Sequence, residues 1–115
     1  MRILDVDHAS PSEAHALTGH LVEGEEVHFA FVSATGLILF TALRIVIVQR
    51  EHLLDERLET SSYPYREVRH FSLTEGSALR TLRIWLGAEP QPLQLRAKEG
   101  ADFGPLQRLL ASRLG

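Results

Sequence analysis

The stretch from Leu37 to Val48, LILFTALRIVIV, is the part of the chain around which the predicted fold is built. Two apolar blocks, Leu37–Phe40 and Ile45–Val48, are separated by the four residues Thr41–Arg44. Blocks this short, and this rich in aliphatic and β-branched residues, are typical of strands buried on both faces. The short break predicts a hairpin, although it lacks the Asn-Gly or Asp-Gly pair that favours the tightest turns. We therefore expect a central hairpin in a β-rich domain, with a structural rather than a chemical role.

Composition limits what the chain can be. With 115 residues, of which 44% are hydrophobic and 23% charged, it has the make-up of one globular domain. The absence of cysteine excludes disulfides, thiolate metal sites and cysteine nucleophiles. The net charge of −3 gives no push toward nucleic acid, so we expect no nucleic-acid partner. The longest apolar run falls far below the roughly 20 residues of a spanning helix. We therefore predict a cytoplasmic protein without a transmembrane segment.

The first 26 residues differ from the remainder, because they hold one arginine against six acidic residues. Ser10-Pro11-Ser12-Glu13 is typical of a helix start, with Ser10 as the cap and Glu13 placed to bond back to it. Apolar residues at helical spacing follow, and Gly24 is suited to end the helix. We expect a short N-terminal helix over about 11–21. The predicted organisation is an acidic helical segment, 1–26, ahead of a β-rich domain, 27–115.

From residue 27 onward the apolar residues alternate with polar ones, which predicts half-buried antiparallel strands. Besides the two strands of the hairpin, we expect strands at 27–32, 57–65, 67–73, 82–86 and 93–97, with a polar loop at 49–56. After Gly100, Asp102 can cap a final helix whose apolar stripe begins at Phe103. The predicted fold is mainly β: a seven-stranded bent antiparallel sheet or barrel, capped by a C-terminal helix.

Particular residues accompany this order of elements. They are Gly24-Glu25, Leu39–Ile45, Tyr63-Pro64-Tyr65-Arg66 leading into Val68, Phe71-Ser72, Leu82–Leu86 and the terminal helix. In this order and spacing they resemble the bacterial pleckstrin-homology-like (PH-like) domain family, over about Leu21 to Leu114. The resemblance implies a PH-like sheet closed by a C-terminal helix, assembly into ring-shaped homo-oligomers, and no catalytic activity general to the family.

No catalytic or cofactor motif accompanies this pattern. The chain has no G-x-S-x-G, no P-loop and no H-E-x-x-H. His15 and His20 are five residues apart on the expected helix, which places them on divergent sides rather than at metal-ligand spacing. The acidic group Glu23, Glu25 and Glu26 is interpreted as a turn before a strand, not as an acid–base pair. We therefore expect no enzyme activity, catalytic residue, cofactor or metal.

Arginines and tyrosines supply the candidate binding residues, because both types are enriched at the energetic centres of protein interfaces. The predicted interface residues are Arg44, Tyr63, Tyr65, Arg66 and Arg69. For Arg44 a second interpretation stays open, in which its guanidinium caps strand carbonyls or pairs with a glutamate of the same monomer.

Two functions follow. The first is a non-enzymatic interaction module that self-assembles and binds a protein or peptide partner by strand addition or in a groove. The alternative is binding of a small ligand or lipid headgroup at the open end of the barrel, near Ser33–Gly36, Arg50–Glu56 and Gly87–Gln91. Inositol-phosphate binding at Ser33–Gly36 is not expected, because that turn holds no lysine or arginine. Peripheral contact with a lipid surface is not expected in general.

Overall fold

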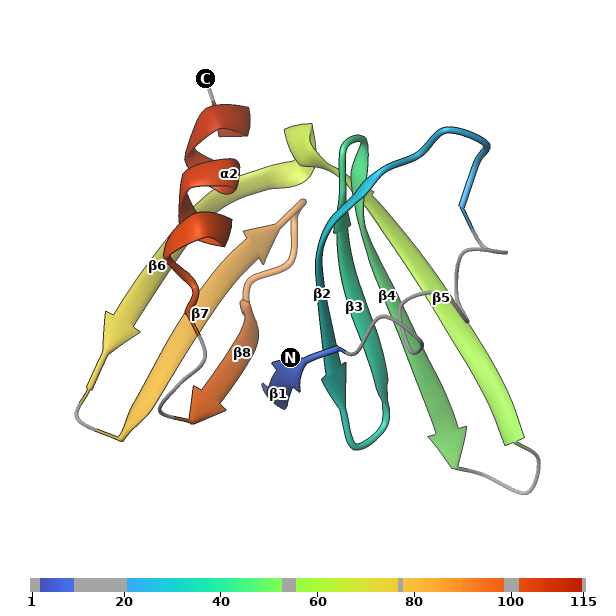
Figure 1. Ribbon diagram of the computed structural model, residues 1–115, viewed down its shortest axis with the longest axis horizontal. Helices are drawn as coiled ribbons and strands as arrows, with labels where there is room; N and C mark the ends of the chain where they lie inside the picture. Colours follow the sequence, from blue (N-terminus) through green and yellow to red (C-terminus); the bar gives the residue numbers. More distant parts are fainter. Residues whose placement is uncertain (1–2, 10–20, 53–55, 77, 99–101, 115) are drawn as a thin grey trace. The chain divides into compact units, whose positions relative to one another are not determined.

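The computed structural model describes residues 3–9, 21–52, 56–76, 78–98 and 102–114 (Figure 1). In these residues the elements are β1 (Ile3–His8), β2 (Val27–Ser33), β3 (Gly36–Thr41), β4 (Arg44–His52), β5 (Glu56–Pro64), the 3-10 helix η2 (Tyr65–Glu67), β6 (Val68–Glu75), β7 (Leu79–Leu86), β8 (Leu93–Lys98) and α2 (Gly104–Leu114). They belong to two compact units. We call His8–Tyr63 the hairpin unit, and Met1–Asp7 together with Pro64–Gly115 the helix unit.

The hairpin unit is built on the Leu37–Val48 stretch, which forms the antiparallel strands β3 and β4 as predicted. The strand order is β2-β3-β4-β5. Register pairs such as Ile38 with Ile47 and Leu39 with Val46 place both apolar blocks side by side. Both faces are buried, because Ile38, Leu39, Val46 and Ile47 are all at most 2% exposed. The predicted two-sided burial is confirmed.

Aromatic packing and one close backbone approach fix the rest of this unit. Phe31 of β2 meets Phe40 of β3 edge-on, with the ring centroids 6.1 Å apart and the planes at 88°. At the turn between β2 and β3, the Thr35 N–H donates to Ser33 Oγ over 3.3 Å. Gly36 then opens β3 with its Cα directly against the backbone of Val48, where a side chain would collide with the carbonyl oxygen.

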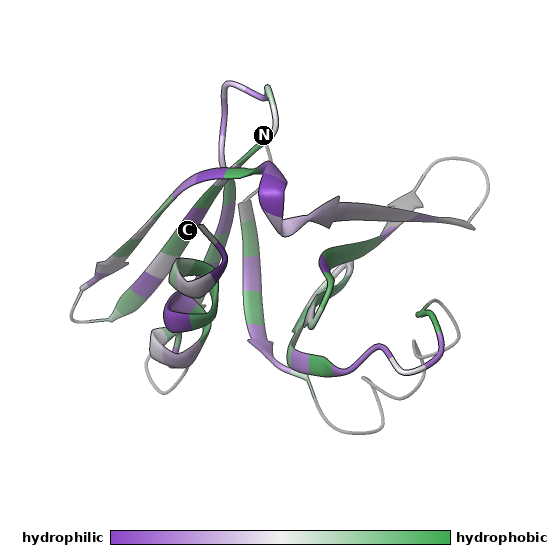
Figure 2. Ribbon diagram, turned by 90° about the horizontal axis from the view of Figure 1, so that it is seen from above, coloured by the Kyte–Doolittle hydropathy of each residue, from purple (hydrophilic) through white to green (hydrophobic). Residues whose placement is uncertain are grey.

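The helix unit holds strands in the order β1-β8-β7-β6, together with α2 (Figure 1). One face of the sheet is apolar, and α2 contributes buried residues to the same core. The buried set is Leu82, Ile84, Leu86, Leu93, Leu95, Ala97, Phe103, Leu106 and Leu110. Figure 2 shows the alternation of hydrophobic and hydrophilic residues along these strands and around α2. The predicted start of the helix is confirmed, because Asp102 Oδ1 accepts the Gly104 N–H over 2.8 Å.

Four expectations need correction or stay open. The chain has eight strands rather than seven in the described residues, because Ile3–His8 forms β1, which pairs in parallel with β8. The predicted loop at 49–56 is wrong, since β4 extends to His52 and β5 begins at Glu56; backbone pairing continues past the point where the side chains stop being apolar. The expected helix over 11–21 falls almost entirely outside the described residues. The division of the chain at residue 26 stays a prediction.

Candidate functional site

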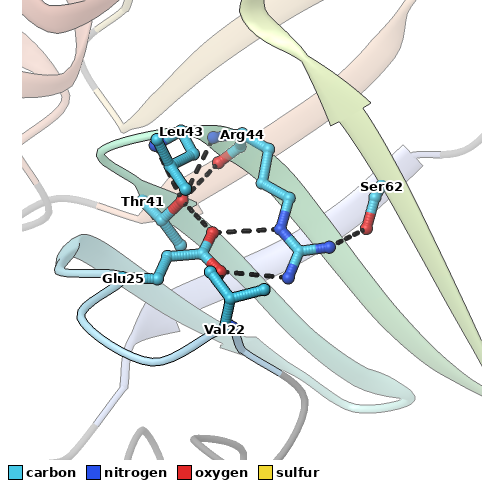
Figure 3. A network of polar contacts seen from close by, with 6 residues as sticks. All are labelled: Val22, Glu25, Thr41, Leu43, Arg44 and Ser62. Carbon is cyan, nitrogen blue, oxygen red and sulfur yellow. Dashed lines mark hydrogen bonds and ion pairs between the residues drawn. The ribbon is translucent and has the colours of Figure 1, made fainter.

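Glu25, Thr41 and Arg44 form a tightly bonded polar network in the described part of the hairpin unit (Figure 3). Glu25 lies just before β2, Thr41 ends β3 and Arg44 opens β4. The guanidinium of Arg44 binds the Glu25 carboxylate with two parallel bonds, Nε to Oε2 and Nη2 to Oε1, each 3.0 Å long. This bidentate, charge-assisted geometry makes the pair stronger than one between neutral groups.

The Thr41 hydroxyl is the hub of the same network. It donates to Glu25 Oε2 over 2.5 Å and accepts the N–H groups of Leu43 and Arg44, each over 3.1 Å. Two further bonds widen the network: the Val22 N–H donates to Glu25 Oε1 over 3.1 Å, and Arg44 Nη1 donates to Ser62 Oγ over 2.7 Å (Figure 3). The network therefore ties the segment before β2 to the β3–β4 turn and to β5.

The electrostatics of the pair favour a structural role. The Glu25 side chain is 0% exposed and that of Arg44 is 25% exposed. Hydrogen bonds from Arg44 lower the pKa of Glu25 to about 2, with help from Thr41 and the Val22 N–H and against the desolvation that would raise it. The same pairing raises the pKa of Arg44. A carboxylate held ionised at every physiological pH cannot act as a general acid or base near neutrality.

The second interpretation of Arg44 is therefore confirmed, since it pairs with a glutamate of the same monomer. Its role in an interface between subunits stays a prediction. Sequence reasoning placed Glu25 in an acidic turn and in the family resemblance, but its pairing with Arg44 was not predicted, because the two partners are 19 residues apart and nothing local in the sequence joins them.

The other predicted interface residues belong to β5, η2 and β6. Tyr63 is half-buried in β5 of the hairpin unit, whereas Tyr65 is 6% exposed in η2 of the helix unit. Arg113 of α2 lies over the Tyr65 ring, with the guanidinium carbon 5.3 Å from the ring centroid. Tyr65 is thus a core residue. Arg66 and Arg69 are exposed, and Arg69 Nη2 donates to the backbone carbonyl of Glu89 over 2.6 Å.

These two arginines adjoin a terminal strand of the sheet. Within the helix unit β6 ends the strand order, next to β7. Phe71 and Leu73 of β6 are only half-buried, whereas their β7 partners Ile84 and Leu82 are 0% exposed. We call Arg66, Arg69, Phe71 and Leu73 the β6 edge. It combines a strand edge with two partly covered apolar side chains and two cations.

In the described part of the chain no three His, Asp or Glu side chains lie close enough together to hold a metal ion. The same residues include no helix with the length and apolar run that crossing a bilayer requires.

The two units, with a C-terminal helix that follows the last strand, define a PH-like class of fold. In solved structures this fold occurs in a DUF1696-family protein with a pleckstrin-homology domain from Shewanella loihica PV-4. The match has a TM-score of 0.78 and 18% identity, and covers 96% of this chain and 98% of that one. It also occurs in a pleckstrin homology domain from Shewanella amazonensis SB2B, with a TM-score of 0.69, 22% identity and coverage of 90% and 96%.

Sequence comparison gives the particular family. The family model of the bacterial PH domain matches residues 3–114. The uncharacterized protein YjqA of Bacillus subtilis (strain 168) is 30% identical over 96 residues, which cover 80% of this chain and 77% of that protein. The chain belongs to the bacterial PH domain family. The resemblance found from the residues alone is confirmed, including the C-terminal helix that it implied.

Proposed function

We propose that this chain is a non-enzymatic PH-like interaction module that self-assembles into a homo-oligomer and binds a protein or peptide partner. The observation that carries the proposal is the β6 edge. A terminal strand offers unpaired backbone groups to another chain, and half-buried apolar side chains beside it gain further burial on association. Arginines next to such an edge are well suited to pair with carboxylates of the arriving surface.

In the self-assembly step, a second copy of the chain occupies the β6 edge. The proposed contact is heterologous: the β6 edge of one copy meets a different surface of the next copy. Repeated heterologous contacts close into a ring when the rotation between copies allows it. Partner binding then uses the other terminal strand, β5, to which an extended peptide adds through backbone hydrogen bonds. A cytoplasmic location is part of the same proposal.

Light scattering on the 115-residue chain tests the self-assembly step. Arg66→Glu reverses an exposed charge of the β6 edge and should lower the oligomer mass. Arg69→Glu should act in the same direction. Arg108→Glu reverses another exposed charge, on α2, and is the matched control, which should leave the mass unchanged. If Arg66→Glu and Arg108→Glu give the same mass as the unmodified chain, the contact does not lie at the β6 edge.

Binding of a small ligand or lipid headgroup near Ser33–Gly36, Arg50–Glu56 and Gly87–Gln91 stays an alternative. Residues 53–55 of the second segment lie outside the described residues. The side-chain hydrogen bonds described at Ser33–Gly36 are internal to the turn, such as the Ser33 Oγ bond to the Gly36 carbonyl over 3.4 Å. Polar groups satisfied within their own turn do not favour a ligand site there.

A further inference from the structure

The sheet of the helix unit has a second face, opposite the buried side chains of β7. Because strand side chains alternate, the residues between Leu82, Ile84 and Leu86 point to that other face. The register then fixes two neighbouring rows across the sheet: His70 with Trp85, and Ser72 with Arg83 and Gln94. We call these residues, with Thr74, the outer-face cluster.

Two rings form one end of this cluster. The His70 and Trp85 rings lie with their centroids 4.8 Å apart and their planes at 48°. His70 is exposed and Trp85 is half-buried, so neither ring belongs to the apolar core. Aromatic rings on an open sheet face offer a stacking surface for flat ligands.

The guanidinium of Arg83 forms the other end of the cluster. Arg83 Nη1 donates to Thr74 Oγ1 over 3.2 Å, and in the described residues no Asp or Glu pairs with it. Arg96, the next arginine across the sheet, differs. Its Nε and Nη2 bind the two carboxylate oxygens of Asp5 over 2.9 and 3.2 Å. Of these two guanidiniums, Arg83 is the one left for an external anion.

Charge in this part of the chain does not oppose an anion. The expectation of no nucleic-acid partner rested on the net charge of −3 for the whole chain. The helix unit by itself holds nine Arg and Lys residues against seven Asp and Glu, a net charge of +2. The negative charge of the molecule therefore belongs to the hairpin unit.

We propose that the outer-face cluster binds a nucleotide, with the base against Trp85 and His70 and the phosphate on Arg83. Trp85 and Arg83 are alternate residues of β7, so they stand about 7 Å apart along the strand. That separation suits a base and its own phosphate, joined by one sugar. The guanidinium fork matches phosphate oxygens, and Ser72 and Gln94 beside it supply further polar groups. The nucleotide can be free or part of a single strand, because the chemistry is the same.

Trp85 is the single tryptophan of the chain, so its fluorescence reports directly on this cluster. The full-length chain is titrated at low salt with adenosine monophosphate, adenosine, inorganic phosphate and a short oligodeoxyadenylate. We expect the monophosphate to quench Trp85 at concentrations where adenosine and phosphate alone do not. If the oligodeoxyadenylate binds much more tightly than the monophosphate, the ligand is a nucleotide within a single strand. If the two bind with equal affinity, the ligand is a free nucleotide.

Variants separate a site at Arg83 from general charge effects. Arg83→Gln should weaken the monophosphate about tenfold or more, since it removes charged hydrogen bonds. Arg83→Lys keeps the positive charge but lacks the guanidinium fork. Its affinity for the monophosphate should lie between those of the unmodified chain and Arg83→Gln. Arg108→Gln removes an exposed charge of the same unit elsewhere and should leave the affinity unchanged. Circular dichroism establishes that each variant is folded. Absence of quenching by every nucleotide, or equal weakening by Arg83→Gln and Arg108→Gln, would overturn the proposal.

Discussion

At the scale of single residues, the Glu25–Arg44 pair should be among the most sensitive positions of the chain. Glu25→Gln keeps the shape of the side chain but removes the charge that holds the Arg44 fork. We expect the free energy of unfolding to fall by about 2 kcal/mol at neutral pH, because charged hydrogen bonds contribute about 1.5–3 kcal/mol. Denaturant titration measures the loss. Glu89→Gln, at an exposed side chain, is the matched control and should be near neutral.

The lowered pKa of Glu25 makes this loss depend on pH. Because the folded-state pKa is about 2 and the ordinary value is 4.5, folding favours the ionised carboxylate. Its stabilisation is complete above the unfolded value and disappears as the pH falls through about 2. The free energies of unfolding of the unmodified chain and of Glu25→Gln should therefore differ at pH 7 and become equal as the pH falls from about 5 to about 2. A constant difference across that window would contradict the assigned pKa.

Thr41→Val tests the hub at the same scale. Valine reproduces the branched shape, but it leaves the N–H groups of Leu43 and Arg44 without their acceptor and removes a donor to Glu25. We expect a loss of about 1–3 kcal/mol. Since Thr41 and Glu25 act on each other, the double variant should lose less than the two single losses combined. Additive losses would show that the hydroxyl and the carboxylate act independently.

At the scale of elements, the β3–β4 pairing should depend on the one glycine that lets the strands approach. In Gly36→Ala the new methyl group would overlap the Val48 carbonyl oxygen, and neither is the end of a flexible side chain. The backbone must move, so we expect a destabilisation of about 3 kcal/mol, the upper part of the range for overpacking. Gly76→Ala, whose new methyl group would meet Leu79 O at 3.3 Å, should cost much less in the same denaturant assay. Equal losses would argue against the close approach at Gly36.

Elements also differ in how far their sequence predicts them. The β3–β4 hairpin was predictable because its two apolar blocks need burial on both faces, and α2 because Asp102 and the stripe after Phe103 are local signals. β1 was not, because acidic residues interrupt its short apolar pattern and its partner β8 is about 90 residues away. The same holds for the site. Arg44 was predicted to pair with some glutamate of the monomer or to bind a partner. Its actual pairing with Glu25, and the contact of His70 with Trp85, depend on which residues face each other across neighbouring strands. Composition does not encode that register.

At the scale of the whole molecule, charge is divided unequally between the units. The helix unit has a net charge of +2, and the hairpin unit, with three Arg against eight Asp and Glu, has −5. In the proposed heterologous assembly, the arginines of the β6 edge of one copy meet the acidic unit of the next, so opposite charges face each other. Salt should therefore weaken the oligomer, because the screening length falls from about 10 Å at 0.1 M to about 3 Å at 1 M.

Two exposed glutamates allow a sharper test, because the same charge change is made in each unit. Glu59→Lys adds two positive charges to the hairpin unit and should lower the oligomer mass at low salt. Glu89→Lys adds two to the helix unit and should preserve or raise it. Opposite effects from one chemical change cannot arise from net charge, which both variants shift equally. Equal masses for the two variants, or a mass that is insensitive to salt, would contradict this charge pairing between copies.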